Sequence, residues 1–218
     1  MKEFSSNKVI VFDMDDTLYF ELDFVKSGFQ AVSNYVMEKH NIPSSQIFCE
    51  LMNDFVTNGS GKNLNVLCEK YHKINLKEII DIYRFHKPNI KLPIDSKFVL
   101  MELKRIGFKL ALLTDGHEKT QLHKIQSLDL EQYIDFIIRT GVYGTPKPAI
   151  NCFEMIQEKF PNCEYTYIAD NPKKDFIAPQ KLGWKSIRIV NANGIYSKLP
   201  TPESVKEITS LCEIVDHL

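Results

Sequence analysis

Short runs of consecutive apolar residues recur along the chain, separated by segments in which apolar residues stand three or four positions apart. The first run, Val9 to Phe12, is continuous rather than alternating and is rich in β-branched residues, as expected of a strand that is covered on both faces. Further runs lie at 108–114, 136–140, 165–169 and 186–190, and helical spacing fills about 96–106, 117–128, 148–160 and 174–182. This alternation predicts an α/β fold built on a parallel sheet.

Between Phe20 and about Pro93 the pattern changes to helical spacing without a convincing buried strand. Four apolar series with a spacing of three or four residues follow one another, and Asn, Gly and Pro residues separate them. They begin near Phe24, Ile47, Leu64 and Leu76. We therefore predict a helical domain at residues 20–93, inserted into a core domain made of residues 1–19 and 94–218.

The tail that begins at Asn191 has no clear periodicity. Its pattern allows a capped helix from Thr201, or a short strand near Ile208 followed by a helix. Both alternatives stay open.

Length and charge narrow the class of partner. The 218 residues suit one core domain with a sizeable insertion, and 27 basic against 28 acidic residues give a formal net charge of -1, so no basic field favours nucleic acid or anionic lipid. The chain has neither an apolar leader nor an 18-residue apolar run, so we expect neither secretion nor a membrane partner. Its five cysteines form an odd number without CxxC spacing, which favours reduced thiols in a cytoplasm over disulfides or zinc.

Three acidic residues follow directly on the first predicted strand, in the stretch "VIVFDMDDT". Side chains two positions apart in an extended chain share a side, so Asp13 and Asp15 face one point while Asp16 points away, toward the loop or the start of the insertion. Two carboxylates at one point repel each other unless a cation lies between them. The stretch is either an acidic turn in water or a site for a hard cation, with one acid left as nucleophile or acid/base.

Further polar residues follow the other predicted strands. Thr114, Asp115 and Gly116 end one strand with a hydroxyl group and backbone amides, and Lys147 precedes a helix expected to open at Pro148; both arrangements suit a phosphate. The stretch "ADNPKKD" adds the carboxylates of Asp170 and Asp175. A turn, a solvated lysine or a helix cap would explain each feature alone. Because the carboxyl ends of parallel strands bind ligands, their succession predicts one phosphate and cation site.

The chain resembles the phosphatase branch of the haloacid dehalogenase-like superfamily across residues 9 to 190. The resemblance is carried by four stretches that match the four motifs of this superfamily in order: "DMDDT", "LLTDG", "KP" and "ADNPKKD". The resemblance implies a Rossmann-like sheet core with helices on both faces and a helical cap inserted after the first motif. It also implies Mg²⁺-dependent hydrolysis of a phosphomonoester through an aspartyl-phosphate. Ala169 stands where many members have glycine.

The resemblance also implies a role for each matching residue. Asp13 is the nucleophile, Asp15 donates a proton to the leaving alcohol and later accepts one from water, and Asp175 orients Lys147 or the metal shell. The expected sets are catalytic Asp13, Asp15, Thr114 and Lys147; substrate-binding Thr114, Asp115, Gly116 and Lys147; and Mg²⁺-binding Asp13, Asp15 through its main-chain carbonyl, and Asp170.

Several other functions compete with a phosphatase. A phosphomutase or phosphotransferase stays open on the same scaffold, whereas family members that dehalogenate typically lack the acid at Asp15. An inactive phospholigand-binding relative would be expected to have lost Asp13 or Asp15. A receiver domain, as the non-enzyme alternative, would place the acidic pair and the phosphorylated aspartate on different strands and leaves no room for the insertion at 20–93.

The expected partner is a small phosphorylated metabolite, such as a sugar phosphate or a nucleoside monophosphate. The near-neutral net charge and the mixed polar insertion favour it over a phosphoprotein. Two segments are candidates for choosing the substrate: residues 19–21, directly after the first motif, and the glycine-containing loop at 57–63. We expect a monomer or a homodimer.

Overall fold

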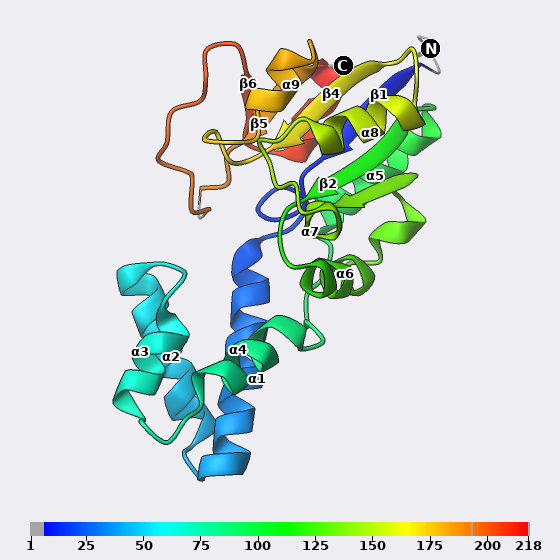
Figure 1. Ribbon diagram of the computed structural model, residues 1–218. Helices are drawn as coiled ribbons and strands as arrows, with labels where there is room; N and C mark the ends of the chain where they lie inside the picture. The colour runs from blue at the N-terminus through cyan, green and yellow to red at the C-terminus, as the bar shows by residue number, and fades with distance from the viewer. Residues whose placement is uncertain (1–6, 193, 218) are drawn as a thin grey trace. The chain divides into compact units, whose positions relative to one another are not determined.

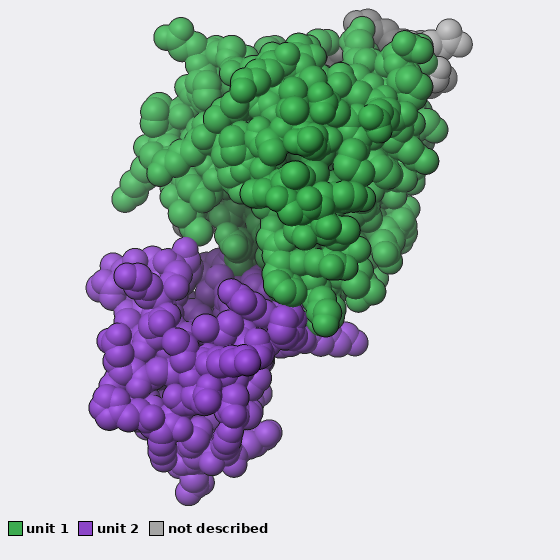
Figure 2. All heavy atoms as spheres, viewed as in Figure 1, with its two compact units in different colours: residues 1–21, 91–218 green, residues 22–90 purple. Residues whose placement is uncertain are grey.

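The computed structural model of the protein describes residues 7–192 and 194–217. Residues 1–6, Asn193 and Leu218, which belong to the predicted core domain, lie outside the described residues. The chain divides into two compact units: unit 1 comprises Met1–Glu21 and Lys91–Leu218, and unit 2 comprises Leu22–Ile90 (Figure 2). In the described part of the chain, no helix combines the length and the apolar character that a membrane crossing requires.

Unit 1 is built on a parallel sheet, which contains six strands over the described residues. The strands are β1 (Lys8–Phe12), β2 (Lys109–Thr114), β3 (Phe136–Arg139), β4 (Glu164–Ala169), β5 (Lys185–Ile189) and β6 (Lys206–Ile208). Their order is β3-β2-β1-β4-β5-β6, with β1 paired to both β2 and β4 (Figure 1). The α/β prediction is confirmed. A receiver domain is excluded, because its sheet has the order 2-1-3-4-5.

Alternate residues of the strands face opposite layers of helices. Val9 and Val11 pack in a buried cluster with side chains of α8 (Asn151–Lys159) and α9 (Ile177–Lys181), and Figure 1 shows α8 crossing the sheet on this side. Ile10 and Phe12 have the opposite parity and are also buried. Helix α5 (Ile94–Arg105), which contacts β2, has a buried side of its own formed by residues such as Val99 and Leu103. Burial on both faces explains why the strands are continuous apolar runs rather than alternating ones.

Unit 2, all of whose residues are described, consists of four helices, as the apolar spacing predicts. They are α1 (Glu21–His40), α2 (Ser44–Asn58), α3 (Asn63–Lys70) and α4 (Leu76–Phe85). The first residue of α1 still belongs to unit 1. The apolar residues Val32, Val36, Ile47, Leu51 and Ile79 form the centre of a buried cluster separate from the sheet. Unit 2 therefore has a core of its own.

Two predicted helices differ from those of the structure. No helix opens at Pro148; residues 146–149 form a turn closed by Ala149 N and Pro146 O at 3.0 Å, and the first helical bonds of α8 run to the carbonyl of Ile150. The helix predicted at 174–182 covers only 177–181. Before this helix begins, Asp175 accepts a hydrogen bond from Asn171 N at 3.1 Å, which holds the chain in a loop. Asp side chains often bind nearby backbone groups in this way and thereby compete with helix formation.

Further helices of unit 1 lie between its strands and in its tail. Strand β3 ends one residue earlier than predicted, and Thr140 begins the short helix α7 (Thr140–Tyr143), which the pattern did not indicate. Helix α6 (Glu118–Ser127) follows β2, and η1 (Leu130–Gln132) follows α6. In the tail, β6 and the 3₁₀ helix η2 (Leu211–His217) match the strand-then-helix alternative; a helix from Thr201 is wrong.

Candidate active site

Asp13 and Asp170 stand directly after the neighbouring strands β1 and β4. The Asp13 amide continues the pairing of these strands by donating to the carbonyl of Ile168 at 2.9 Å. The order of the strands reverses between β1 and β4, and ligands of open α/β sheets bind in the crevice outside such a reversal point. The sheet thus brings the first and fourth motifs together where a ligand is expected.

Lys147 binds one residue of the first motif, one of the fourth motif and one of strand β4. Its Nζ lies 2.9 Å from Asp13 Oδ1, 2.8 Å from Asp175 Oδ1 and 3.0 Å from the hydroxyl of Tyr167. Only 1% of the Lys147 side chain is exposed. Burial would lower the pKa of this ammonium, but Asp13 and Asp175 outweigh it and hold the pKa well above its usual value. The charged form of Lys147 is therefore favoured beside Asp13.

Asp13, Asp170 and Asp175 form a cluster of buried carboxylates. Each offers an oxygen atom, and these atoms all lie within 4.8 Å of one another. Burial raises the pKa of Asp13 to about 7 against the attraction of Lys147. Burial, followed by repulsion from Asp13 and Asp175, raises the pKa of Asp170 to about 9. These raised pKa values show that the Lys147 ammonium alone does not compensate the cluster when all three groups are ionised, and a hard divalent cation with oxygen ligands fits this donor set.

The carboxylate of Asp15 lies outside this cluster because it is bonded to helix α6. Oδ1 accepts a bond from Lys124 Nζ at 2.7 Å and from the hydroxyl of Tyr19 at 2.5 Å, and Oδ2 accepts one from Gln121 Nε2 at 3.1 Å. Burial would raise the pKa of Asp15, but the Lys124 ammonium and these hydrogen bonds lower it. The expected role of the Asp15 main-chain carbonyl as a metal ligand stays a prediction.

The second motif is held by side-chain bonds. Thr114, the last residue of β2, is fully buried and accepts a bond from Gln121 Nε2 at 2.8 Å. Asp115 Oδ1 accepts bonds from the Thr140 hydroxyl at 2.8 Å and from Lys147 N at 3.0 Å. The Asp115 carboxylate thereby ties the second motif to the third, while its backbone and that of Gly116 remain the expected phosphate donors.

The Asp16 carboxylate bonds to residues outside the cluster of Asp13, Asp170 and Asp175. Parity in an extended chain does not account for this, because Asp15, two residues after Asp13, also lies outside that cluster. Asp16 Oδ1 accepts bonds from Glu21 N at 2.9 Å and from Asn191 Nδ2 at 3.3 Å. Glu21 is the first residue of α1, so Asp16 stabilises the beginning of that helix. Its φ of 52° is in the left-handed region, which Asp and Asn tolerate better than most residues.

Sequence reasoning missed several polar residues of this site. Lys124 and Gln121 bind Asp15, Tyr167 binds Lys147, and the buried Arg188 of β5 donates to the carbonyl of Asp170 at 3.0 Å. Arg188 also bonds to the carbonyls of Tyr196 and Leu199, which fixes the chain after β5. A signal existed for Arg188, because a charged residue inside a buried apolar strand requires partners.

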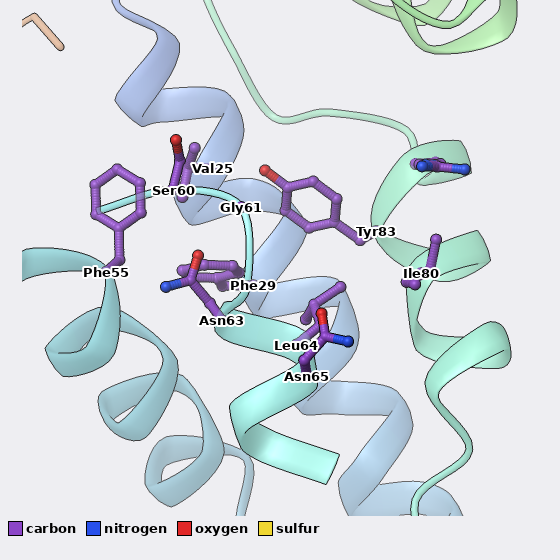
Figure 3. A pocket seen from close by; sticks show the side chains of 11 residues that line it. Val25, Phe29, Phe55, Ser60, Gly61, Asn63, Leu64, Asn65, Ile80 and Tyr83 are labelled. Atoms are coloured by element: carbon purple, nitrogen blue, oxygen red, sulfur yellow. The ribbon is translucent and has the colours of Figure 1, made fainter. Parts of the chain in front are cut away.

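Unit 2 contains a pocket of its own, with a volume of about 200 Å³ (Figure 3). Its lining is apolar side chains with five polar ones: Ser60, Asn63, Asn65, Tyr83 and Arg84. The candidate loop at 57–63 contributes Ser60, Gly61 and Asn63 to the lining of this pocket. Its Asn63 amide donates to Asp54 Oδ2 at 2.6 Å and to the Gly59 carbonyl at 2.9 Å and therefore holds the loop in place; Asn58 and Lys62 are not part of the lining.

Comparison with known proteins agrees with this geometry. The haloacid dehalogenase-like hydrolase family matches residues 10–189. A glyceraldehyde 3-phosphate phosphatase of Methanocaldococcus jannaschii is 30% identical over 220 residues, covering 96% of each chain. A phosphoglycolate phosphatase of Aquifex aeolicus is 26% identical, covering 82% of this chain and 83% of its own.

Solved structures support the same assignment at the level of the fold. The magnesium-bound HAD-hydrolase YfnB of Bacillus subtilis has a TM-score of 0.70 at 19% identity, covering 97% of this chain and 98% of its own. The family matches most of the chain, and a phosphatase relative spans its length. These matches confirm the family that the four motifs indicated. The chain belongs to the haloacid dehalogenase-like hydrolase family, in its phosphatase branch.

Proposed function

We propose that the protein is a Mg²⁺-dependent phosphatase that hydrolyses a small phosphomonoester through an aspartyl-phosphate on Asp13. The observation that carries the proposal is the convergence of Asp13, Lys147 and the carboxylates of Asp170 and Asp175 at the ends of β1 and β4. Phosphoryl transfer needs a positioned nucleophile and positive charge around the phosphoryl oxygens. This site supplies the nucleophile, one buried cation and the ligands for a second.

In the first step an Asp13 carboxylate oxygen attacks phosphorus, and the bond from phosphorus to the substrate oxygen breaks. Lys124 and the hydrogen bonds to Asp15 favour its carboxylate form, so Asp15 must take up a proton before this step. It then gives that proton to the substrate oxygen, which leaves as an alcohol. Lys147 stays beside Asp13 and binds the transferring phosphoryl group, together with Thr114 and the backbone amides near Gly116. Asp13 and Asp170 would hold Mg²⁺, which neutralises charge on the phosphoryl oxygens when bound.

In the second step water attacks phosphorus of the aspartyl-phosphate. Asp15, now a carboxylate, accepts a proton from that water, and the bond from phosphorus to the Asp13 oxygen breaks. Inorganic phosphate leaves, and Asp13 and Asp15 return to their starting states. One difficult displacement is thereby divided into two easier ones.

Unit 2 is the proposed recognition unit, because its pocket has the lining of a small-molecule site. Apolar and aromatic side chains with a few polar groups are typical of small-molecule pockets. The relatives act on glyceraldehyde 3-phosphate and phosphoglycolate, so phosphorylated compounds of two or three carbons are the first substrates to test, ahead of hexose phosphates and nucleoside monophosphates.

The proposal is tested by the release of inorganic phosphate from a panel of these compounds and from p-nitrophenyl phosphate, each with Mg²⁺ and with excess chelator. We expect turnover that requires Mg²⁺ and a kcat/KM that is largest for one small phosphomonoester. Absence of turnover across the panel at millimolar Mg²⁺ would exclude the function. Conversion of a sugar phosphate into an isomer without net phosphate release would indicate a phosphomutase instead.

A further inference from the structure

Helix α6 presents a polar side to the interior of unit 1. Its buried residues are Thr120, Gln121, Lys124 and Ile125. Gln121 and Lys124 are 2% and 4% exposed, and lysine is almost never buried to this extent unless it is paired. Residues three apart lie on the same side of a helix, so both side chains reach the same neighbourhood. Such a costly arrangement calls for a specific partner.

That partner is the carboxylate of Asp15. Lys124 approaches Oδ1 at 2.7 Å, and Gln121 approaches Oδ2 at 3.1 Å, so the two oxygens are bound from one helix. The hydroxyl of Tyr19 is the third donor to this carboxylate and binds Oδ1 at 2.5 Å. A carboxylate with donors on both oxygens has little freedom to rotate.

Gln121 also connects Asp15 to the second motif. The same Nε2 lies 2.8 Å from Thr114 Oγ1 and is bonded to the carbonyl of Asp115. An amide nitrogen has two hydrogen atoms, so three acceptors compete for them. A Cβ atom at Gly116 would approach the Gln121 amide to 3.1 Å, so this contact favours the absence of a side chain there.

We propose that Lys124 and Gln121, with Tyr19, are positioning residues that hold Asp15 in place for proton transfer to the leaving alcohol and from the attacking water. They act through Asp15 and do not touch phosphorus themselves. The effect on the rate of proton transfer rests on the proposed function. The interaction between Lys124 and Asp15 can also be measured through protein stability, without any turnover.

The kinetic test compares kcat/KM of Lys124→Met on two substrates that differ in their need for a proton. p-Nitrophenolate leaves with little protonation, whereas an alkyl phosphate such as glycerol 3-phosphate needs the proton of the general acid. General acid catalysis contributes roughly 10²–10⁴-fold, so we expect Lys124→Met to lose at least ~10-fold more on the alkyl phosphate. Lys124→Arg should recover most of this difference, and Lys119→Met, at an exposed position of the same helix, should show none.

Equal losses of Lys124→Met on both substrates would overturn the positioning role. Absence of turnover by the unchanged protein would instead contradict the proposed function, and the contact is then judged by stability alone. For that, thermal unfolding of Asp15→Asn, Lys124→Met and the double variant is compared. We expect the double variant to lose less than the sum of the single losses, because each single change leaves a buried partner unpaired. Additive losses would show that Lys124 does not hold Asp15, whatever the activity.

Discussion

Lys147 Nζ lies 2.9 Å from Asp13 Oδ1, and only 1% of the lysine side chain and 10% of the aspartate side chain are exposed. Asp175 binds the same ammonium at 2.8 Å from a fully buried position. One cation therefore holds the proposed nucleophile and a residue of the fourth motif together. Removal of one partner from a buried ion pair costs much more than the net stabilisation by the pair, because the other charge stays buried.

Lys147→Met should consequently destabilise the protein as well as inactivate it. We expect the free energy of unfolding, measured by urea denaturation without Mg²⁺, to fall by about 3–5 kcal/mol. Lys39→Met is the matched control, because the Lys39–Glu78 pair is 44% and 42% exposed and exposed pairs contribute about 0–1 kcal/mol. Similar losses for both variants would show that Lys147 does not compensate buried charge.

Asp170→Asn should abolish stabilisation by Mg²⁺. A ligand at a hundredfold excess over Kd stabilises by about 2.7 kcal/mol, which corresponds to a rise in Tm of about 5–10 °C for a chain of this size. The pKa of Asp170 at about 9 keeps the carboxyl protonated at neutral pH without metal, and an asparagine amide resembles that state. The Tm of the metal-free variant should therefore stay close to that of the unchanged protein.

The control for the metal experiment is Asp129→Asn. Asp129 is exposed and has a φ of 51°, in the left-handed region that asparagine also tolerates. This variant should retain the full rise in Tm with Mg²⁺. A rise that survives in Asp170→Asn would contradict a cation site at Asp13, Asp170 and Asp175.

Asp16→Asn should be far milder than Asp15→Asn. An asparagine oxygen can still accept the bond from Glu21 N, and the left-handed φ of 52° suits asparagine, so we expect kcat to change by no more than a few-fold. Asp15→Asn removes the proposed acid/base and should lower kcat on an alkyl phosphate by roughly 10²–10⁴-fold. Comparable losses in the two variants would contradict the division of roles between these adjacent acids.

Arg84→Met should separate recognition from chemistry if the pocket of unit 2 binds the substrate. Arg84 contributes the cationic part of the lining, so its loss should raise KM for an anionic small phosphomonoester several-fold while kcat on p-nitrophenyl phosphate stays the same. Arg105→Met, at an exposed position of α5 in unit 1, should alter neither constant. An unchanged KM for Arg84→Met would remove this pocket from the proposed recognition site.

The sheet and the four motifs could be predicted because both follow from position along buried strands. Continuous apolar runs identify β1, β2 and β4, and the polar residues that end them converge at one edge. The pairing of Lys147 with Asp175 was one of two alternatives that the sequence left open, and the structure shows it. Helix spacing likewise indicated the four helices of unit 2, since each has an apolar side.

The binding partners of Asp15 could not be predicted in this way. Periodicity counts apolar residues, and the buried side of α6 contains a glutamine and a lysine, which by their pattern resemble a solvated surface. The start of α8 was predicted at Pro148, which is too early. A proline is common at the first position of a helix, but its presence does not distinguish a helix start from a turn that precedes the helix. Polar residues whose burial depends on a distant strand become visible only when the strands are placed side by side.

The central claim, that Asp13 carries the phosphoryl group, is tested most directly by acid quenching during turnover. The protein is mixed with Mg²⁺ and a substrate labelled in its phosphoryl group, then denatured in acid within the first turnovers. We predict label on the protein, released by hydroxylamine as expected of an acyl phosphate, and located in the peptide that contains Asp13. Asp13→Asn should show neither label nor phosphate release, and turnover by that variant would contradict the account.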